Sequence, residues 1–581
     1  MTRSGPSGFL ATPAGTFCHG IEIGGVHRRV LAYVPDGARA STSGVVVVPD
    51  SGVTIEQAMA ESGWVEIADG ERHREKLIVF FCEASERWSP EEPADDLAYL
   101  GAVARFVESR FWFCVHESKR SIAGYGEGAV IAKMAALTDP AFYASVVAVN
   151  ASPLPDGFRE RTEVADCENL QGFVNGGRFP IAKGQIGLPV WLIDDGQPGS
   201  DDELAAWQRR NRCGVEGSEI DGSTTEFTRC APVSHPMDEE PGAFRVRRSR
   251  IPGAGAQAGS VVNARLWSEF LSRHRRWMSL PGGDLRRTAD PVEGLGMEHH
   301  LEEIDGVTRE WYVHVPVRVR TSGHPAAVVV AMHGYTCSGE VYVGNSGWAQ
   351  VADEFGFIVV FPTAMPGRLD VGVPELDPNF TPLPAWNIVG AAGADVDDLA
   401  FIDAVLARTA RDWLVDPARI YATGHSWGSV MTHSLAACRP ERFAAVAPCS
   451  GVFFGNMLEP VRDKAVEAPR PVPVWMLWGS EEEWLISPRP DDGTQAAATI
   501  RFWAERNGVE VPENLSAALE NVHIDAAART WRQAEFIRAG VPVVRYTIVD
   551  GLPHATMPSM SRRIWTDFFA GIRKGDGPAM T

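Results

Sequence analysis

An internal repeat is the feature of this sequence that most restricts its fold. Two stretches, 23–35 and 304–316, each run from an Ile through a Gly-Val pair to a Val-Pro over the same spacing. Each pattern predicts two strands around a glycine turn. Further landmarks recur in the same order in both halves: apolar runs at 44–48 and 326–332, Gly-Trp pairs at 63–64 and 347–348, and Pro-Val-Trp at 189–191 and 473–475. The sequence therefore predicts two copies of one fold.

Both copies alternate continuous apolar runs with helix-like segments. Leu77–Phe81 and Phe357–Phe361 are such runs at matching places. Uninterrupted apolar strands between amphipathic helices are typical of a mostly parallel sheet that helices cover on both faces. With 581 residues, the chain is also too long for one ordinary core. We expect α/β domains at 1–285 and 292–581, joined through the Gly/Pro-rich segment 279–291.

Charge and cysteine usage argue against several classes of protein. The formal net charge of −21 argues against a surface for nucleic acid or anionic lipid. No apolar run approaches the length of about 18 residues that a membrane-spanning helix needs. The nine cysteines are scattered without a C-x-x-C pair, and the N-terminal segment does not resemble a signal peptide, so a reduced, cytoplasmic protein is predicted. No Cys or His spacing predicts a metal site.

The motif Gly424-His-Ser-Trp-Gly428 carries the main chemical prediction. It follows an apolar strand at 419–422 and precedes a helix-like run at 429–437. In that setting, G-x-S-x-G forms a sharp turn that lifts the serine hydroxyl above the sheet edge. The same motif as a chance turn in a loop would lack this strand–turn–helix context. We therefore predict Ser426 as a nucleophile.

A serine hydroxyl needs a base, and the base needs a carboxylate to orient it. His554 follows the apolar strand 543–549 and precedes the final helix, where the base of such a site is expected; the alternative is a histidine in a surface loop. The acid is expected after the strand 472–478, where three glutamates follow Gly479. Glu482 is preferred by its offset, with Glu481 and Glu483 as alternatives.

The oxyanion hole is predicted from two backbone N–H groups. One belongs to Trp427, directly after the nucleophile, and the other to Tyr335 in the turn 333–336 after an early core strand. A simple strand-exit turn is the alternative for the second. Trp348, Trp386 and Trp427 are candidates for an aromatic substrate pocket, although tryptophan in a core is more common. His425 is placed among the substrate-binding candidates because it adjoins Ser426.

Further motifs give the second half a family resemblance. Trp386-Asn387 is followed by Asp397-Asp398-Leu-Ala-Phe-Ile402, and Val415-Asp-Pro-Ala-Arg leads into the serine motif. Residues from about 300 to 575 thereby resemble the poly(3-hydroxybutyrate) depolymerase-like esterases, which include feruloyl and acetylxylan esterases. The resemblance implies the α/β-hydrolase fold and ester hydrolysis through an acyl-enzyme, without a cofactor.

The sequence departs from this family in three respects. Its acid is Glu rather than Asp, Tyr335 stands where Cys often follows His-Gly, and no signal peptide is recognised. The last two departures favour a small or soluble ester over a polymer.

The first half has lost the residues that this chemistry needs. Gly126 falls opposite Ser426, Ala256 falls opposite His554, and the stretch 192–198 offers no clear counterpart of Glu482. Neither Gly nor Ala can attack a carbonyl or move a proton. We therefore expect a catalytically dead copy of the fold at 1–285. A different site built from Ser121, Asp194, Asp195 and His235 is the alternative.

Together these features predict a serine-dependent carboxylic ester hydrolase that acts on a small or oligomeric ester. An acyltransferase or a peptidase could use the same three residues, because the residues do not decide what resolves the acyl-enzyme. A non-enzymatic binding or scaffold protein would need both halves to be degenerate, which the intact serine motif and the later histidine oppose. The sequence does not set the acyl group, the alcohol or the oligomeric state.

Overall fold

A computed structural model describes most of the chain, and the statements below concern only these residues. They are 14–38, 41–70, 76–111, 115–167, 182–195, 200–229, 243–252, 259–277, 284–367, 383–390, 393–453, 456–468, 470–482, 489–491, 493–525, 529–552 and 554–575. The chain divides between Thr288 and Ala289 into two compact units, here called the N-terminal and the C-terminal unit. The division falls inside the segment expected to join them. Part of that segment, β12 (Asp284–Arg287), is a strand paired with β11 (His274–Trp277).

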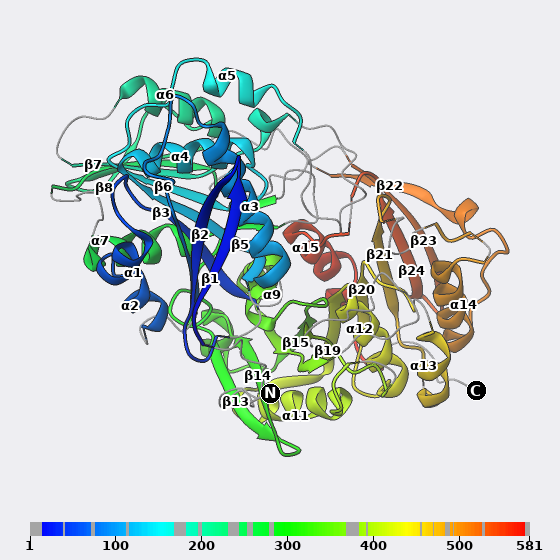
Figure 1. The fold of residues 1–581 in the computed structure, drawn as a ribbon. Helices are drawn as coiled ribbons and strands as arrows, with labels where there is room; N and C mark the ends of the chain where they lie inside the picture. The colour runs from blue at the N-terminus through cyan, green and yellow to red at the C-terminus, as the bar shows by residue number, and fades with distance from the viewer. Residues whose placement is uncertain are drawn as a thin grey trace. The chain divides into compact units, whose positions relative to one another are not determined.

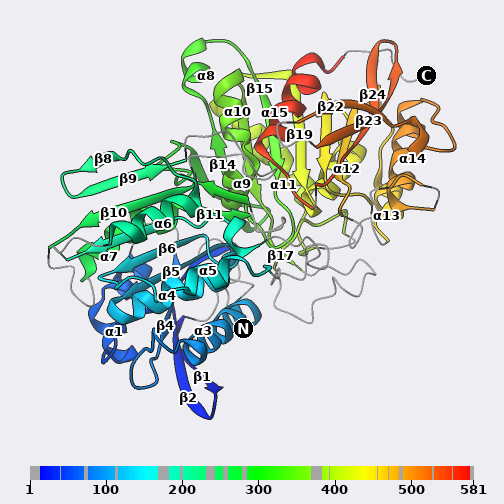
Figure 2. The same cartoon turned by 90° about the horizontal axis from the view of Figure 1, so that it is seen from above.

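Each unit contains one ten-stranded sheet, and the strand order of the two sheets is the same. Figures 1 and 2 show the two sheets with helices packed on them. The N-terminal order is β1-β2-β4-β3-β5-β6-β7-β10-β9-β8, and the C-terminal order is β13-β14-β16-β15-β19-β20-β21-β24-β23-β22. The N-terminal strands are β1 (Gly15–Ile23), β2 (Val26–Val34), β3 (Thr42–Val48), β4 (Leu77–Cys82), β5 (Val115–Tyr125), β6 (Ser145–Val149), β7 (Val190–Asp194), β8 (Ser218–Asp221), β9 (Thr224–Thr228) and β10 (Arg245–Arg250). The C-terminal strands are β13 (Glu298–Ile304), β14 (Val307–His314), β15 (Ala326–Met332), β16 (Ile358–Thr363), β19 (Val415–His425), β20 (Ala445–Cys449), β21 (Val474–Gly479), β22 (Glu520–Ile524), β23 (Thr530–Arg538) and β24 (Val541–Val549).

The middle of each sheet is parallel and its edges are antiparallel hairpins. In the C-terminal unit, β16, β15, β19, β20, β21 and β24 run parallel, while the β13–β14 and β22–β23 pairs flank them. Both predicted glycine turns are present, because β1 pairs with β2 and β13 with β14 around them. Figure 2 shows the second edge hairpin of the N-terminal unit, β8–β9, beyond β10. The predicted duplication of one α/β fold is thus confirmed.

Helices cover both faces of each sheet. In the N-terminal unit, Val46 and Val48 of β3 face α3 (Ala94–Phe111), α4 (Gly126–Thr138) and α6 (Asp201–Asn211) in one apolar cluster. Val45 and Val47 belong to the opposite cluster, with α1 (Ile55–Glu61), α2 (Trp64–Asp69) and α7 (Ser260–Glu269). Because successive side chains of a strand point to opposite faces, a continuous valine run supplies both cores. This explains the absence of polar alternation in the sequence.

The C-terminal unit has the same two layers. One face packs on α11 (Asp398–Asp412), α12 (Trp427–Cys438) and α14 (Gln495–Asn507). The other carries α10 (Trp348–Phe355) and α15 (Pro558–Asp567), with aromatic rings between them and the sheet. The remaining described helices of four or more residues are α5 (Phe158–Glu163), α8 (Val317–Ser322), α9 (Gly339–Ser346) and α13 (Leu458–Lys464), and β17 (Pro366–Gly367) pairs with β18 (Leu383–Pro384).

Both units share a buried brace between the second strand and the helix that follows the fourth strand. Arg28 pairs with Asp96 at 2.7 Å in one copy, and Arg309 pairs with Asp398 in the other. A tryptophan accompanies each pair: the indole N–H of Trp88 donates to the carbonyl of Pro49, and that of Trp386 donates to the carbonyl of His333. In each copy the indole bond holds the first residue after the third strand, and in the C-terminal unit that turn borders the candidate site.

Within the described residues, no helix combines the length and the apolar character needed to cross a membrane.

Candidate active site

Ser426 lies at a strained turn between β19 and α12. Its φ of 56° and ψ of −118° place it in a left-handed region that a residue with a side chain rarely adopts. Its backbone N–H donates to the carbonyl of Cys449 on the neighbouring strand β20 at 3.0 Å. The strand ends at His425 and the helix begins at Trp427, so a single residue makes the turn. This strand–turn–helix arrangement is the one predicted from the motif.

The two glycines of the motif allow three backbones to approach one another. A Cβ at Gly424 would lie 2.3 Å from the carbonyl oxygen of Gly428. A Cβ at Gly428 would lie 2.3 Å from the carbonyl oxygen of Met332 and 2.5 Å from that of His333. Such distances exclude any side chain at either position. The motif therefore brings the turn at Ser426 against the end of β15.

A buried carboxylate and an imidazole meet beside this turn. Glu482 has no exposed surface, and its Oε2 lies 2.8 Å from Nδ1 of His554, whose side chain is 15 % exposed. A carboxylate at Nδ1 favours the tautomer that carries its proton there, which makes Nε2 the acceptor nitrogen. The ring of His425, next to Ser426 in the chain, has its centroid 4.7 Å from that of His554. The imidazole thus lies beside the serine turn.

Of the three glutamates after Gly479, Glu482 is the one that bonds to His554 in the described part of the chain. The carboxylate of Glu481 accepts from the hydroxyl of Ser480 at 3.0 Å, and Glu483 lies outside the described residues. The offset from Gly479 therefore singled out the glutamate that meets the imidazole.

Ser450 is a residue of this cluster that the sequence did not reveal. Its hydroxyl donates to Oε1 of Glu482 at 2.9 Å and lies 3.3 Å from the carbonyl of Ala555, next to His554. The backbone N–H of Gly479 also donates to Oε1, at 2.7 Å. With Oε1 held by two donors, Oε2 faces the imidazole. The available signal was a serine with Gly451 directly after an apolar strand, which is too common to stand out.

The turn expected to hold the second oxyanion donor adjoins the serine. A Cβ at Gly334 would lie 3.2 Å from Cβ of Ser426, which places Tyr335, the next residue, close to it. Buried His333 holds the turn: its Nδ1 lies 2.6 Å from the carbonyl of Gly334, and its Nε2 accepts from the N–H of Ala364 at 3.0 Å. Burial lowers the pKa of His333 to about 4, so the ring is neutral at neutral pH.

The substrate-pocket assignments of the tryptophans need correction. Trp348, Trp386 and Trp427 are each at most 1 % exposed. Trp348 stacks on Phe569 in the core beside α15. The indole of Trp427 donates to the carbonyl of Trp386 at 2.7 Å, and the indole of Trp386 in turn donates to His333. These rings belong to the core, and the indole of Trp386 supports the backbone of the turn that begins at His333.

His425 is also buried and not open to a substrate. It is 5 % exposed, and burial, with the nearby His554, holds its pKa well below the ordinary value. The neutral imidazole of His425 packs against the ring of His554. The predicted role in substrate binding is therefore replaced by one in packing.

The structure describes only part of the expected losses in the N-terminal unit. Gly126 stands at the turn between β5 and α4, with a φ of 54° that matches Ser426. Ala256, His235 and residues 196–199 lie outside the described residues. Of the alternative site, Ser121 bonds to Ser145 on the next strand at 3.0 Å, and Asp194 pairs with Arg248. These two contacts are structural, between neighbouring strands of the sheet.

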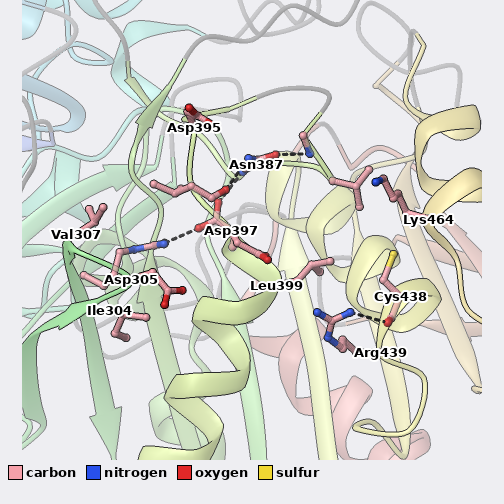
Figure 3. A pocket seen from close by; sticks show the side chains of 15 residues that line it. Ile304, Asp305, Val307, Asn387, Asp395, Asp397, Leu399, Cys438, Arg439 and Lys464 are labelled. Carbon is pink, nitrogen blue, oxygen red and sulfur yellow. Dashed lines mark hydrogen bonds and ion pairs between the residues drawn. The ribbon is translucent and has the colours of Figure 1, made fainter.

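The C-terminal unit has a cavity of about 550 Å³ apart from these groups (Figure 3). It is bordered by the β13–β14 turn, residues 387–390 and 395–399, the end of α12 and Lys464. Figure 3 shows Asn387 and Asp397 on one side of it and Arg439 and Lys464 on the other. Neither Ser426 nor His554 lines it. Among the described residues, no group of His, Cys, Asp and Glu side chains could hold a metal ion.

The strand order, the turn at Ser426 and the buried carboxylate–imidazole pair define the C-terminal unit as an α/β-hydrolase domain. The N-terminal unit has the same fold without the serine. No known protein-family model matches this chain.

Similar proteins are acetylxylan esterases. Over 181 residues the chain is 24% identical to a bifunctional acetylxylan esterase/xylanase of Neocallimastix patriciarum, and this match covers 31% of the present chain and 22% of that protein. Over 150 residues it is 29% identical to acetylxylan esterase A of Talaromyces purpureogenus, covering 25% and 34% of the two chains. The matches span about a third or less of these relatives' length. A solved acetyl xylan esterase from Aspergillus awamori is 16% identical, with a TM-score of 0.33, over 47% of this chain and 98% of that one. The similarity to acetylxylan esterases predicted from the motifs is confirmed.

Proposed function

We propose that the C-terminal unit hydrolyses carboxylic esters through an acyl-enzyme on Ser426. The observation that carries this proposal is the buried carboxylate of Glu482, bonded to an imidazole that lies beside a strained serine turn. A serine at a strained strand-to-helix turn is the arrangement of a nucleophile in this fold, and a carboxylate on the imidazole beside it orients that ring for proton transfer.

The geometry supports a specific order of proton transfers. His554, protonated at Nδ1 and oriented by Glu482, removes the proton of the Ser426 hydroxyl through Nε2 as the oxygen attacks the ester carbonyl. The backbone N–H groups of Tyr335 and Trp427 stabilise the oxyanion that forms. The imidazolium then gives its proton to the leaving alcohol. Water, activated by the same imidazole, releases the acid and restores the serine.

Short acetyl esters are the first substrates to examine, because the similar proteins are named as acetylxylan esterases. Trp386 and Trp427 are buried in the core, so neither ring offers an open surface to a large aromatic acyl group. We therefore place acetyl and other small acyl esters ahead of bulky ones. Hydrolysis of p-nitrophenyl acetate compared with longer p-nitrophenyl esters measures this preference.

Labelling with a fluorophosphonate probe tests the nucleophile. The wild-type protein should be labelled once, and Ser426→Ala should be neither labelled nor active. Ser434→Ala is the matched control, because Ser434 lies on the same helix and its hydroxyl bonds within that helix, to the carbonyl of Val430 at 2.9 Å. An unlabelled wild-type protein would exclude the proposal. A large gain in turnover only when an alcohol or amine is added would identify an acyltransferase instead.

The N-terminal unit is, in this proposal, a copy without catalytic activity. Gly126 occupies the position of the nucleophile and has no side chain to acylate. The complete loss of labelling in Ser426→Ala is the expected result for such a unit. Residual labelling of that variant, mapped to a peptide from residues 14–288, would contradict it.

A further inference from the structure

The N-terminal unit carries a carboxylate at the place where the C-terminal unit has Gly334. Asp50 is the second residue after β3, as Gly334 is the second after β15. Its Oδ1 accepts the backbone N–H of Ser51 and the backbone N–H of Glu127, both at 2.8 Å. Ser51 follows Asp50 as Tyr335 follows Gly334, and Glu127 follows Gly126 as Trp427 follows Ser426. The two donors on this carboxylate therefore correspond to the two proposed oxyanion donors.

The same carboxylate fills the space of the missing nucleophile. A Cβ at Gly126 would lie 2.2 Å from both Cγ and Oδ1 of Asp50. In the other unit, Gly334 has no side chain, and a Cβ at that position would lie 3.2 Å from Cβ of Ser426. Asp50 and a side chain at position 126 thus exclude each other.

We propose that the N-terminal unit retains the oxyanion-binding site of its fold and fills it with its own Asp50 carboxylate. The site takes a small carboxylate, such as formate or acetate, once the Asp50 side chain is removed. Two convergent N–H groups, one of them in the first turn of the 13-residue helix α4, suit a negative oxygen through hydrogen bonding and through the helix dipole. The comparison with Tyr335 and Trp427 rests on the proposed function, but the contacts of Asp50 do not.

Asp50 gives hydrogen-bond partners to two backbone N–H groups that would otherwise destabilise the N-terminal unit. Unoccupied, two convergent donors at a partly buried helix start would lack partners, which destabilises a fold. An internal carboxylate satisfies both and closes the site to ester carbonyls. A serine introduced at position 126 alone would therefore displace the carboxylate and would not restore a working turn.

Thermal unfolding of the full-length chain with added formate tests the site. Asp50→Gly should lower Tm, and sodium formate should then raise the Tm of this variant saturably, by about 2 °C or more, relative to sodium chloride at the same concentration. Wild-type protein should show no such rise, because its site is filled. Asp290→Gly is the matched control: Oδ1 of Asp290 also accepts two backbone N–H groups, from Val292 and Glu293, but at a turn without a nucleophile position. Equal formate effects on all three proteins would overturn the proposal.

A double-mutant cycle tests the exclusion without formate. Gly126→Ser should lower Tm in the wild-type background, because the new side chain meets Asp50, and should lower it much less in the Asp50→Gly background. If Asp50→Gly does not fold by circular dichroism, Asp50→Ala serves in its place, since it also removes the atoms that a side chain at position 126 would meet. Equal losses of Tm in both backgrounds would contradict the shared space.

The converse substitution links the site to the proposed chemistry. Gly334→Asp should place a carboxylate in the C-terminal oxyanion hole and abolish fluorophosphonate labelling of Ser426. If wild-type protein is not labelled at all, the proposed ester hydrolysis fails while the formate result still decides the role of Asp50. If wild type is labelled and the formate effect is absent, the proposal for Asp50 fails alone.

Discussion

Glutamine has nearly the same shape as glutamate but no charge. Replacement of Glu482 by glutamine therefore tests whether the carboxylate acts by its charge and by fixing the tautomer of His554. The amide oxygen can keep the two donors on Oε1, namely the hydroxyl of Ser450 and the N–H of Gly479. The amide nitrogen then faces Nδ1 of His554 at the place where Oε2 lies 2.8 Å away. Because this nitrogen donates, Nδ1 must accept, and the ring proton moves to Nε2. An imidazole with its proton at Nε2 cannot remove one from Ser426.

The expected loss in kcat is large and specific. A change of tautomer in such a triad costs about 10⁴-fold, which corresponds to about 5.5 kcal/mol of activation free energy. Glu482→Asp should cost about 10²-fold, because shortening by one methylene, about 1.5 Å, moves a carboxylate out of hydrogen-bond reach. Thermal stability of the glutamine variant should stay near wild type, since the amide keeps a hydrogen bond to each of Ser450, Gly479 and His554.

Steady-state hydrolysis of p-nitrophenyl acetate, with Tm measured in parallel, provides the assay. Glu481→Gln is the control, because that carboxylate bonds to Ser480 rather than to the imidazole. A glutamine variant at position 482 that keeps more than a tenth of the wild-type kcat, while remaining folded, would refute the reasoning. So would an equal loss in Glu481→Gln.

Three further predictions concern the surroundings of the site. Ser450→Ala should lower kcat about tenfold with little change in KM, because it removes one donor, of typically about 1.4 kcal/mol, from Glu482; an unchanged kcat would show that Gly479 alone holds the carboxylate. Asp398→Asn should lower the unfolding free energy by about 3 kcal/mol in urea titrations, because it leaves Arg309 buried without its ion partner. Asp397→Asn should have little effect, because Asp397 is exposed and Asn caps a helix about as well as Asp. Burial lowers the pKa of His433 to about 3, so below pH 6.5, the ordinary pKa of histidine, the unfolded chain binds a proton that the folded chain does not. The unfolding free energy should therefore fall by about 2 kcal/mol between pH 6.5 and pH 5. Urea titrations at the two pH values should show a smaller fall for His433→Gln.

The sequence predicted the parts of the fold that local patterns determine. Valine runs, glycine turns and the serine motif depend on neighbours in the chain, and they appear as β3, β15, both first hairpins and the turn at Ser426. The edge hairpin β22–β23 was not predicted, because β22 is largely exposed and Glu520–Ile524 carries no continuous apolar run. An exposed edge strand is defined by its partner more than by its own composition.

Predictions about the site were limited by long-range contacts. Trp386 and Trp427 were candidates for a pocket because an aromatic ring in a sequence gives no sign of where its N–H will bond. Their donors instead bond to backbone carbonyls, those of His333 and Trp386, that lie 53 and 41 residues away in the chain. Ser450 likewise gained its role only when the fold brought it to Glu482, 32 residues further on.

The brace that recurs in both units makes the chain a comparison within itself. The copy with Gly126 has the ion pair of Arg28 with Asp96 and the indole bond of Trp88. The copy with Ser426 has the corresponding ion pair, Arg309 with Asp398, and the corresponding indole bond, that of Trp386. A contact that is present in both copies is expected to serve folding. A contact that is present only in the copy with Ser426 is a candidate for a role in the reaction. Sorting every paired position of the two units by this criterion would separate scaffold from reaction centre without reference to any other protein.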